Sequence, residues 1–173
     1  MTRGPVDVRP VADDQWPILG WLWQAFRSDL SVVVDGYPYP DGRFQARTLQ
    51  AYPGPGRIGY LAWSAHPNTG DDAPVGFALV SGLDGEIRTI DGFWVVPAAR
   101  RHGLGRGLAL DVIGRHRGAW AIPFQHDNHA AGRLWRSVAT AAFGADWTET
   151  AEPVPGKPHV PPDHWIRTTS EPG

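Results

Sequence analysis

Residues 93–105 limit the folds and ligands that are possible for this chain more than any other segment does. An apolar, β-rich run over 93–96 meets Pro97, and a basic turn with two glycines leads into a pattern of helical period. The first turn of a helix has unpaired N–H groups and a partial positive charge, and glycines let that backbone approach a phosphate closely. Arginine adds a permanent cation. The sequence therefore predicts that residues 95–106 bind a phosphate-bearing small molecule.

The order of apolar patterns along the chain predicts an α/β fold. Apolar residues at helical spacing indicate helices near residues 16–30, 104–117 and 131–142, with a weaker one over 43–52. Runs of β character indicate strands over 6–9, 58–64, 75–81, 86–96, 120–124, 147–150 and 164–168. We expect one central mixed sheet of six or seven strands with helices on both faces.

Length and composition bound the functional class. A chain of 173 residues favours a single domain, which we place at 1–169 with 170–173 as a flexible C-terminal tail. The absence of cysteine excludes disulfides, thiolate nucleophiles and cysteine metal sites. Residues 1–10 lack the apolar core of a signal peptide and no apolar run is long enough to span a bilayer, so we expect a cytoplasmic protein without a membrane partner.

The charge balance and the glycine spacing argue against several classes of phosphate-bearing ligand. A formal net charge of −2 argues against DNA or general nucleic-acid binding, and the basic strip over 100–117 is interpreted as a solvated helix face plus a phosphate turn. No G-x-x-x-x-G-K-[ST] string occurs. A dinucleotide-binding fingerprint would need glycine where Leu108 stands, and Gly107 comes one residue early.

The basic turn resembles the acyl-CoA turn of the GNAT acyltransferase superfamily, which reads arginine or glutamine, two residues, glycine, one residue, then glycine or alanine. Arg100, Gly103 and Gly105 occupy those positions. Residues 93–95 resemble the family's bulged fourth strand, and residues 128–135 resemble its second motif, an asparagine with an alanine three residues on and then two bulky residues. The resemblance covers about residues 86–144.

The resemblance implies acetyl-CoA as acyl donor, held in a splay between the fourth and fifth strands of a mostly antiparallel sheet. Main-chain N–H groups of residues 101–106 would hold the pyrophosphate, Arg100 or Arg101 would add charge, and Val95 would pair with the pantetheine arm like an added strand. Asn128 orients the ligand or solvent, or else Asp127 or Asn128 only caps the next helix. The donor-binding residues implied are Phe93, Trp94, Val95, Arg100, Arg101, His102, Gly103, Leu104, Gly105, Arg106, Asn128 and Trp135.

The resemblance also implies direct attack of an amine on the thioester within a ternary complex, which requires a base for the ammonium proton. Asp91 is the first candidate, because alternation along the strand predicts that it shares one face with Phe93 and Val95. The alternative is a polar residue that only pairs with a helix. His126 is the second candidate, and its alternative is a loop histidine that precedes a helix cap.

The residue expected to act as general acid differs from the one that the resembled family commonly has. Trp135 stands where the family commonly has a tyrosine, and indole cannot supply a catalytic proton near neutral pH. The thiolate then leaves unassisted, or Ser137, Tyr37, Tyr39 or water protonates it. Tyr37 and Tyr39 lie in the loop after the first helix, and in the resembled fold this loop covers the acceptor site. We therefore also expect the two tyrosines, together with Asp91, to bind the acceptor, with the tyrosines as an aromatic wall. The alternative is that they belong to a packed surface loop.

These observations predict an N-acetyltransferase that acts on a small-molecule or peptide amine, and the pI of about 6.4 favours a cationic acceptor. Two alternatives remain open: aminoacyl-tRNA as donor, consistent with the basic strip, and a non-catalytic CoA-binding module, consistent with Trp135 and with Gly92 where relatives often have glutamate. No metal is expected, since His126 and His129 have no further dedicated ligand nearby. The family often dimerises, which adds a homodimer to the expectations.

Overall fold

The computed structural model describes residues 6–169 and 171–173, and it contains one seven-stranded sheet in the order β1-β2-β3-β4-β5-β7-β6. Only β4 and β5 are parallel, and every other neighbouring pair is antiparallel. The predicted mixed, mostly antiparallel α/β sheet is confirmed. The strands are β1 (Asp7–Pro10), β2 (Ile58–Ala65), β3 (Asp72–Ser81), β4 (Ile87–Val95), β5 (Ala119–Gln125), β6 (Trp147–Glu152) and β7 (Asp163–Thr168).

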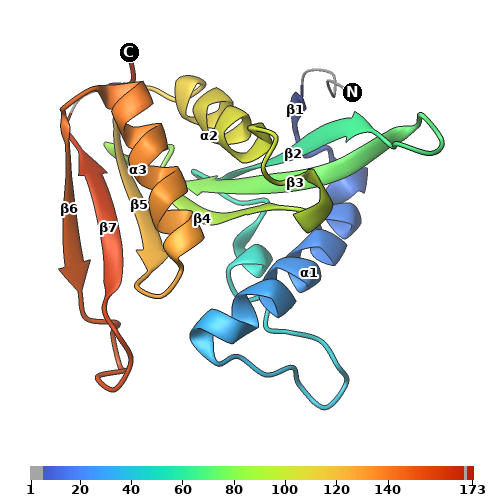
Figure 1. The fold of residues 1–173 in the computed structure, drawn as a ribbon, viewed down its shortest axis with the longest axis horizontal. Coiled ribbons are helices and arrows are strands. Elements are labelled where there is room, and N and C mark those ends of the chain that lie inside the picture. The colour runs from blue at the N-terminus through green and yellow to red at the C-terminus, as the bar shows by residue number, and fades with distance from the viewer. Residues whose placement is uncertain (1–5, 170) are drawn as a thin grey trace.

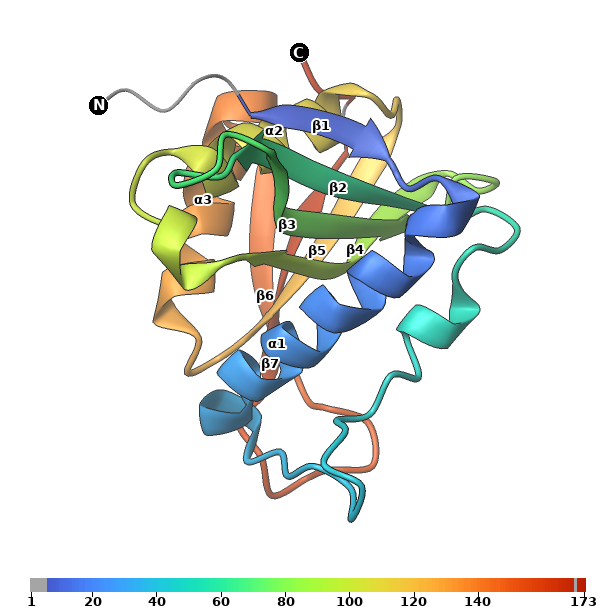
Figure 2. The same ribbon diagram turned by 90° about the vertical axis from the view of Figure 1, so that its right-hand side faces the viewer.

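Three helices cover the two faces of the sheet, α1 on one and α2 and α3 on the other (Figures 1 and 2). They are α1 (Trp16–Val34), α2 (Leu104–Gly114) and α3 (His129–Phe143), with short 3-10 turns η1 (Asp13–Gln15), η2 (Leu49–Ala51) and η3 (Pro97–Ala99). Within the described residues, none of these helices combines the length and apolar character that a membrane crossing requires.

The weak helix expected over 43–52 is wrong, since only η2 forms there. Side chains of α1 bind the main chain of this segment instead: Trp23 Nε1 donates to the Gln45 carbonyl at 2.9 Å, and Gln24 makes hydrogen bonds of 3.0 and 2.6 Å with the carbonyl and N–H of Phe44. Main-chain groups that bind these side chains are not available to an α-helical ladder. Tertiary contacts with α1 therefore override the local helical pattern.

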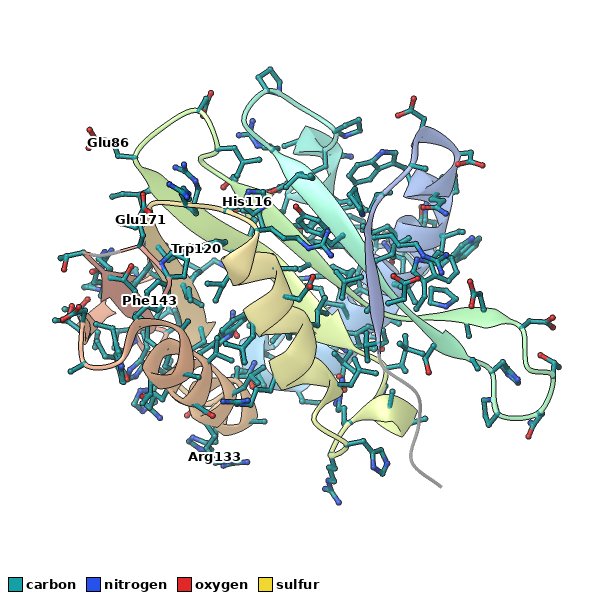
Figure 3. All side chains as sticks on the ribbon, turned by 90° about the horizontal axis from the view of Figure 1, so that it is seen from above. Glu86, His116, Trp120, Arg133, Phe143 and Glu171 are labelled. Carbon is teal, nitrogen blue, oxygen red and sulfur yellow. The ribbon has the colours of Figure 1, made fainter. Side chains whose placement is uncertain are left out.

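The alternation of β3 divides the core into two apolar clusters. Phe77 and Leu79 face α1 and pack with Leu19 and Trp23, whereas Ala78 and Val80 face α2 and α3. In Figure 3, Trp120 and Phe143 lie between the sheet and the helices on the second face, and Arg133 points outward from α3. The sheet is thus buried on both faces over β2, β3 and β4, as the apolar patterns of these strands indicate.

The sheet opens between β4 and β5. These strands pair only over three residues, Ile87–Thr89 against 119–121, and beyond that point β5 pairs with β7 while β4 keeps β3 as its partner. Figure 1 shows β4 continuing toward α1 and η3 while β5 runs away from them. The splay expected from the family resemblance is therefore present.

A β-bulge in β4 changes which face its residues occupy. Val80 pairs with Ile90 and Leu79 pairs with Gly92, so Asp91 is the extra residue of the bulge. Asp91 consequently faces the α1 side, whereas Phe93 packs against the cluster beneath α2 and α3. The prediction that Asp91 shares a face with Phe93 and Val95 is wrong, because one inserted residue breaks the two-residue alternation.

The chain ends beside α3. Ser170 of the predicted tail lies outside the described residues, and the N–H of Gly173 donates to the Ala142 carbonyl at 2.9 Å. Gly144 ends α3 as predicted, with a φ of 62° and an N–H that donates to the Thr140 carbonyl.

Candidate functional site

A cleft of about 480 Å³ opens where β4 and β5 diverge, between α1 and α3. Its walls include all of the predicted donor-binding residues except His102, which is exposed on the turn, and Leu104, which is buried in the core. The cleft is lined by Phe26, Asp29, Leu30, Val33, Phe93, Trp94, Val95, Arg100, Arg101, Gly103, Gly105, Arg106, Asn128, Ala130, Ala131, Leu134 and Trp135.

The turn between η3 and α2 presents main-chain donors to this cleft. Gly103 is the N-cap of α2 with a φ of 76°, and Arg101 is also left-handed, with a φ of 68°. The first helical hydrogen bond runs from the Gly107 N–H to the Gly103 carbonyl, so the N–H groups of the preceding residues have no acceptor within the helix. Arg101 and Arg106 add two exposed cations beside these donors. The arrangement suits an anion.

Arg100 is held by the protein itself. Its Nε donates to the Val95 carbonyl at 2.9 Å, and its guanidinium forms an ion pair with Asp29 and lies over the Trp94 ring. Burial raises the pKa of Asp29, but hydrogen bonds from Arg100 and Trp94 outweigh it and the net pKa is lowered. The charge of Arg100 is therefore matched inside the protein, which favours Arg101 over Arg100 as the cation that faces a ligand.

Two aromatic side chains that touch one another form part of the cleft wall. Phe93 and Trp135 meet edge to face with their ring centroids 4.8 Å apart, and Trp135 is only 3% exposed. Ser137, a candidate acid, is exposed on α3 and does not line the cleft. This part of the wall is thus apolar, and Trp135 offers no acidic proton there.

Asn128 acts as the cap of α3. Its Oδ1 accepts a hydrogen bond from the Ala131 N–H at 3.2 Å, and its Nδ2 donates to Gln125 Oε1 at 3.2 Å. The capping interpretation is confirmed. Asn128 also lines the cleft, and a role toward the ligand stays a prediction.

Asp91 lies outside the cleft lining and is the centre of a polar cluster on the α1 side. The hydroxyls of Tyr52 and Ser81 donate to its carboxylate at 2.8 and 2.9 Å. Burial, reinforced by the neighbouring carboxylate, raises the pKa of Tyr52 strongly, so the phenol remains a donor. The structure pairs Asp91 with a strand residue and a loop residue, and its role as a base stays a prediction.

The two tyrosines after α1 also lie outside the cleft lining. Tyr37 is 82% exposed and Tyr39 is 51% exposed, in a loop where the Tyr39 N–H donates to the Arg43 carbonyl at 2.8 Å. Their roles as acceptor wall and acid stay predictions. Tyr52, buried and bonded to Asp91, is the tyrosine that sequence reasoning missed, since nothing local to its loop indicates the contact.

His126 follows β5 directly and is part of a chain of polar groups. Its Nδ1 lies 2.9 Å from Nε2 of His164, whose Nδ1 lies 2.6 Å from Glu149 Oε1, and Arg136 binds both oxygens of Glu149 at 2.7 Å. His164 and Glu149 could not be predicted from the sequence, because only the strand order β5-β7-β6 brings them beside His126. Within the described residues, no group of three or more His, Cys, Asp or Glu side chains could hold a metal ion.

The Glu149 ion pairs predict a pH-dependent stability. The hydrogen bond from Arg136, with a further one from His164, lowers the pKa of Glu149 from 4.5 to about 2 despite its burial. The stabilisation is therefore complete above about pH 5 and is lost as the pH falls toward 2. We expect Glu149→Gln to lower the free energy of unfolding by on the order of 1 kcal/mol at pH 7 and by almost nothing at pH 2, measured by urea denaturation. An equal loss at both pH values would contradict this.

Comparison with known proteins agrees with this geometry. Residues 16–139 match the model of the Acetyltransferase (GNAT) family, while no curated protein matches the chain. The structure is similar to that of an acetyltransferase from Thermus thermophilus, with a TM-score of 0.64 and 17% identity over 98% of this chain and 99% of the other. It is also similar to Arabidopsis thaliana NAA60 solved in complex with acetyl-CoA, with a TM-score of 0.63 and 14% identity over 96% and 99%.

A third similar structure is the ribosomal-protein-S18-alanine N-acetyltransferase from Escherichia coli, with a TM-score of 0.59 and 14% identity over 98% of this chain and 96% of the other. At these sequence identities the structural similarity supports a shared fold only. The match to the family model covers most of the chain. Together with the splayed strands and the glycine turn at α2, it shows that the chain belongs to the GNAT family of acetyltransferases.

Proposed function

We propose that this protein transfers the acetyl group of acetyl-CoA to the nitrogen of an amine. The observation that carries the proposal is the cleft between β4 and β5, which ends at the left-handed turn and free N–H groups of α2. The pyrophosphate of the donor would bind these N–H groups, with Arg101 and Arg106 as counter-charges.

The open edge of β4 supports a binding mode for the pantetheine arm. The Val96 N–H donates to Val75 on β3, so alternation points the peptide groups of Val95 toward the splay. Arg100 already occupies the Val95 carbonyl, which leaves the Val95 N–H for an amide of the arm. Phe93 and Trp135 would then pack against the thioester end.

Acetyl-CoA supplies a reactive thioester, whose carbonyl carbon is attacked by the amine as the carbon–sulfur bond breaks. The acceptor ammonium must first lose a proton, and Asp91 and His126 are the proposed bases. Trp135 cannot protonate the departing thiolate, so water or a hydroxyl such as that of Tyr37 would do so. A thiol of pKa about 8.5 is a tolerable leaving group without an acid.

The test is transfer to a panel of amines that contains a polyamine, an aminoglycoside and an alanyl peptide. Because the chain has no cysteine, a thiol reagent reports only the CoA released, and mass spectrometry identifies the acetylated product. Release of CoA that depends on an amine supports the proposal. Binding of acetyl-CoA without transfer to any amine would indicate a CoA-binding module, and salt-sensitive binding of aminoacyl-tRNA would indicate the other donor.

A further inference from the structure

Three side chains distant in sequence form a continuous hydrogen-bonded chain across β6, β7 and the end of β5. Glu149 on β6 contacts Nδ1 of His164 on β7 at 2.6 Å, and Nε2 of His164 contacts Nδ1 of His126 at 2.9 Å. His126 is exposed and comes two residues before Asn128, which lines the cleft. The chain therefore runs from the outer strands of the sheet to the segment after β5 that leads to Asn128.

The direction of each hydrogen bond in this chain follows from Glu149. Its carboxylate is ionised and can only accept, because the Arg136 fork binds both oxygens. His164 therefore donates from Nδ1, and in the neutral His164 ring Nε2 then carries a lone pair. That lone pair accepts from Nδ1–H of His126, and Nε2 of the neutral His126 imidazole is left unprotonated as a proton acceptor.

Ring packing holds the two imidazoles in this arrangement. The His164 ring stacks on Phe124 at 5.1 Å with an interplanar angle of 18°, and the His126 ring stacks on His164 at 5.1 Å. The Arg136 guanidinium also lies over the Phe124 ring, 5.4 Å from its centroid. A Cβ at Gly132 would approach both Phe124 and Arg136 to 3.1 Å, so glycine there leaves the room that Arg136 needs to reach Glu149.

We propose that Glu149 and His164 are positioning residues that hold His126 in the tautomer with Nδ1 protonated, so that Nε2 takes the proton of the acceptor ammonium. This inference rests on the proposed function. The ammonium N–H bond breaks, the proton moves to Nε2 of His126, and the free amine keeps the electron pair for attack on the thioester. Glu149 balances the charge of the imidazolium through His164, and solvent then removes the proton from exposed His126.

The charged groups around the chain come from α3, from β7 and from the loop after β5. Arg136 on α3 faces Glu149, Asp163 precedes His164 on β7, and Asp127 follows His126. Burial raises the pKa of Asp163, although His164 and Lys157 oppose this shift. The matched control is Glu152 on β6, whose carboxylate pairs with Arg167 on β7 without a histidine.

The test reads the tautomers directly by ¹⁵N NMR of the imidazoles in the full chain at neutral pH. In the wild type we expect His126 and His164 both to carry the proton on Nδ1. The side-chain amide of Glu149→Gln can donate to Nδ1 of His164, which reverses the direction of both hydrogen bonds. Both rings should then shift toward the Nε2–H form, while Glu152→Gln should leave the tautomers unchanged. An Nε2–H tautomer of His126 in the wild type would overturn the proposal.

Steady-state kinetics measure whether the positioning of His126 affects catalysis. The acceptor is the amine that the panel identifies. We expect Glu149→Gln and His164→Leu to lower kcat about 10- to 100-fold with an unchanged KM for acetyl-CoA. His164→Gln keeps an acceptor for His126 Nδ1–H, so it should retain most of kcat, as should Glu152→Gln. Loss of kcat in proportion to loss of folded protein, or equal loss in His164→Gln and His164→Leu, would overturn the positioning role.

Calorimetry with acetyl-CoA separates this inference from the proposed function. If the wild type binds and transfers acetyl groups but Glu149→Gln retains the tautomer and kcat, the positioning role alone is overturned. If the wild type does not bind acetyl-CoA, the proposed function is overturned and the catalytic role of His126 with it.

Discussion

Acetyl-CoA at about 100 times its Kd is expected to raise the Tm of the wild type by about 5–10 °C and to leave that of Gly105→Asp unchanged. Saturation at this level contributes about 2.7 kcal/mol, and a chain of this length gains about 2–4 °C per kcal/mol. Gly105 lines the cleft in the first turn of α2, where an aspartate would place a negative charge against the pyrophosphate. Differential scanning fluorimetry measures the shift.

The fold should tolerate this substitution. A Cβ at Gly105 meets only ordinary contacts at 3.8 and 3.9 Å, and a carboxylate in the first turn of a helix favours the helix dipole. Gly107→Asp is the matched control, since Gly107 lies two residues further along α2, is exposed, has open space at its Cβ and does not line the cleft. Equal shifts in both variants and the wild type would place the donor elsewhere.

Trp23→Ala is expected to lower the free energy of unfolding by about 3–5 kcal/mol. Trp23 is 2% exposed, packs against Phe26 and Phe77, and donates from Nε1 to the Gln45 carbonyl at 2.9 Å. The substitution removes a large apolar volume between α1 and the sheet and also releases the segment that precedes η2. Urea denaturation followed by circular dichroism measures the change.

Trp21 on the same helix provides the control for Trp23. It is 78% exposed, so Trp21→Ala should change the free energy of unfolding by no more than about 0.5 kcal/mol. Similar losses for the two variants would mean that Trp21 is also buried in solution, for example against a second molecule, and that the burial described for α1 is incomplete.

Local sequence patterns were sufficient to predict the helices and strands with strong periodicity and several of their ends. Leu104, Leu108 and Val112 recur at helical spacing and form the buried side of α2, and Asn128 and Gly144 end α3 where their side-chain and backbone chemistry predicts. These features depend on residues within one turn of one another. The glycine turn belongs to the same class, because its left-handed backbone at Gly103 is a local property.

Which functional groups lie in contact depends on the three-dimensional fold and could not be predicted from local patterns. One inserted residue in β4 turned Asp91 to the α1 face, and α1 supplied Asp29 as the partner of Arg100. Likewise, His126, His164 and Glu149 meet because β7 lies between β5 and β6. The periods of helices and strands are set by residues that are neighbours in sequence. The bulge, the ion pair and the strand order depend instead on residues 10 to 71 positions apart, and local periodicity carries no information about such contacts.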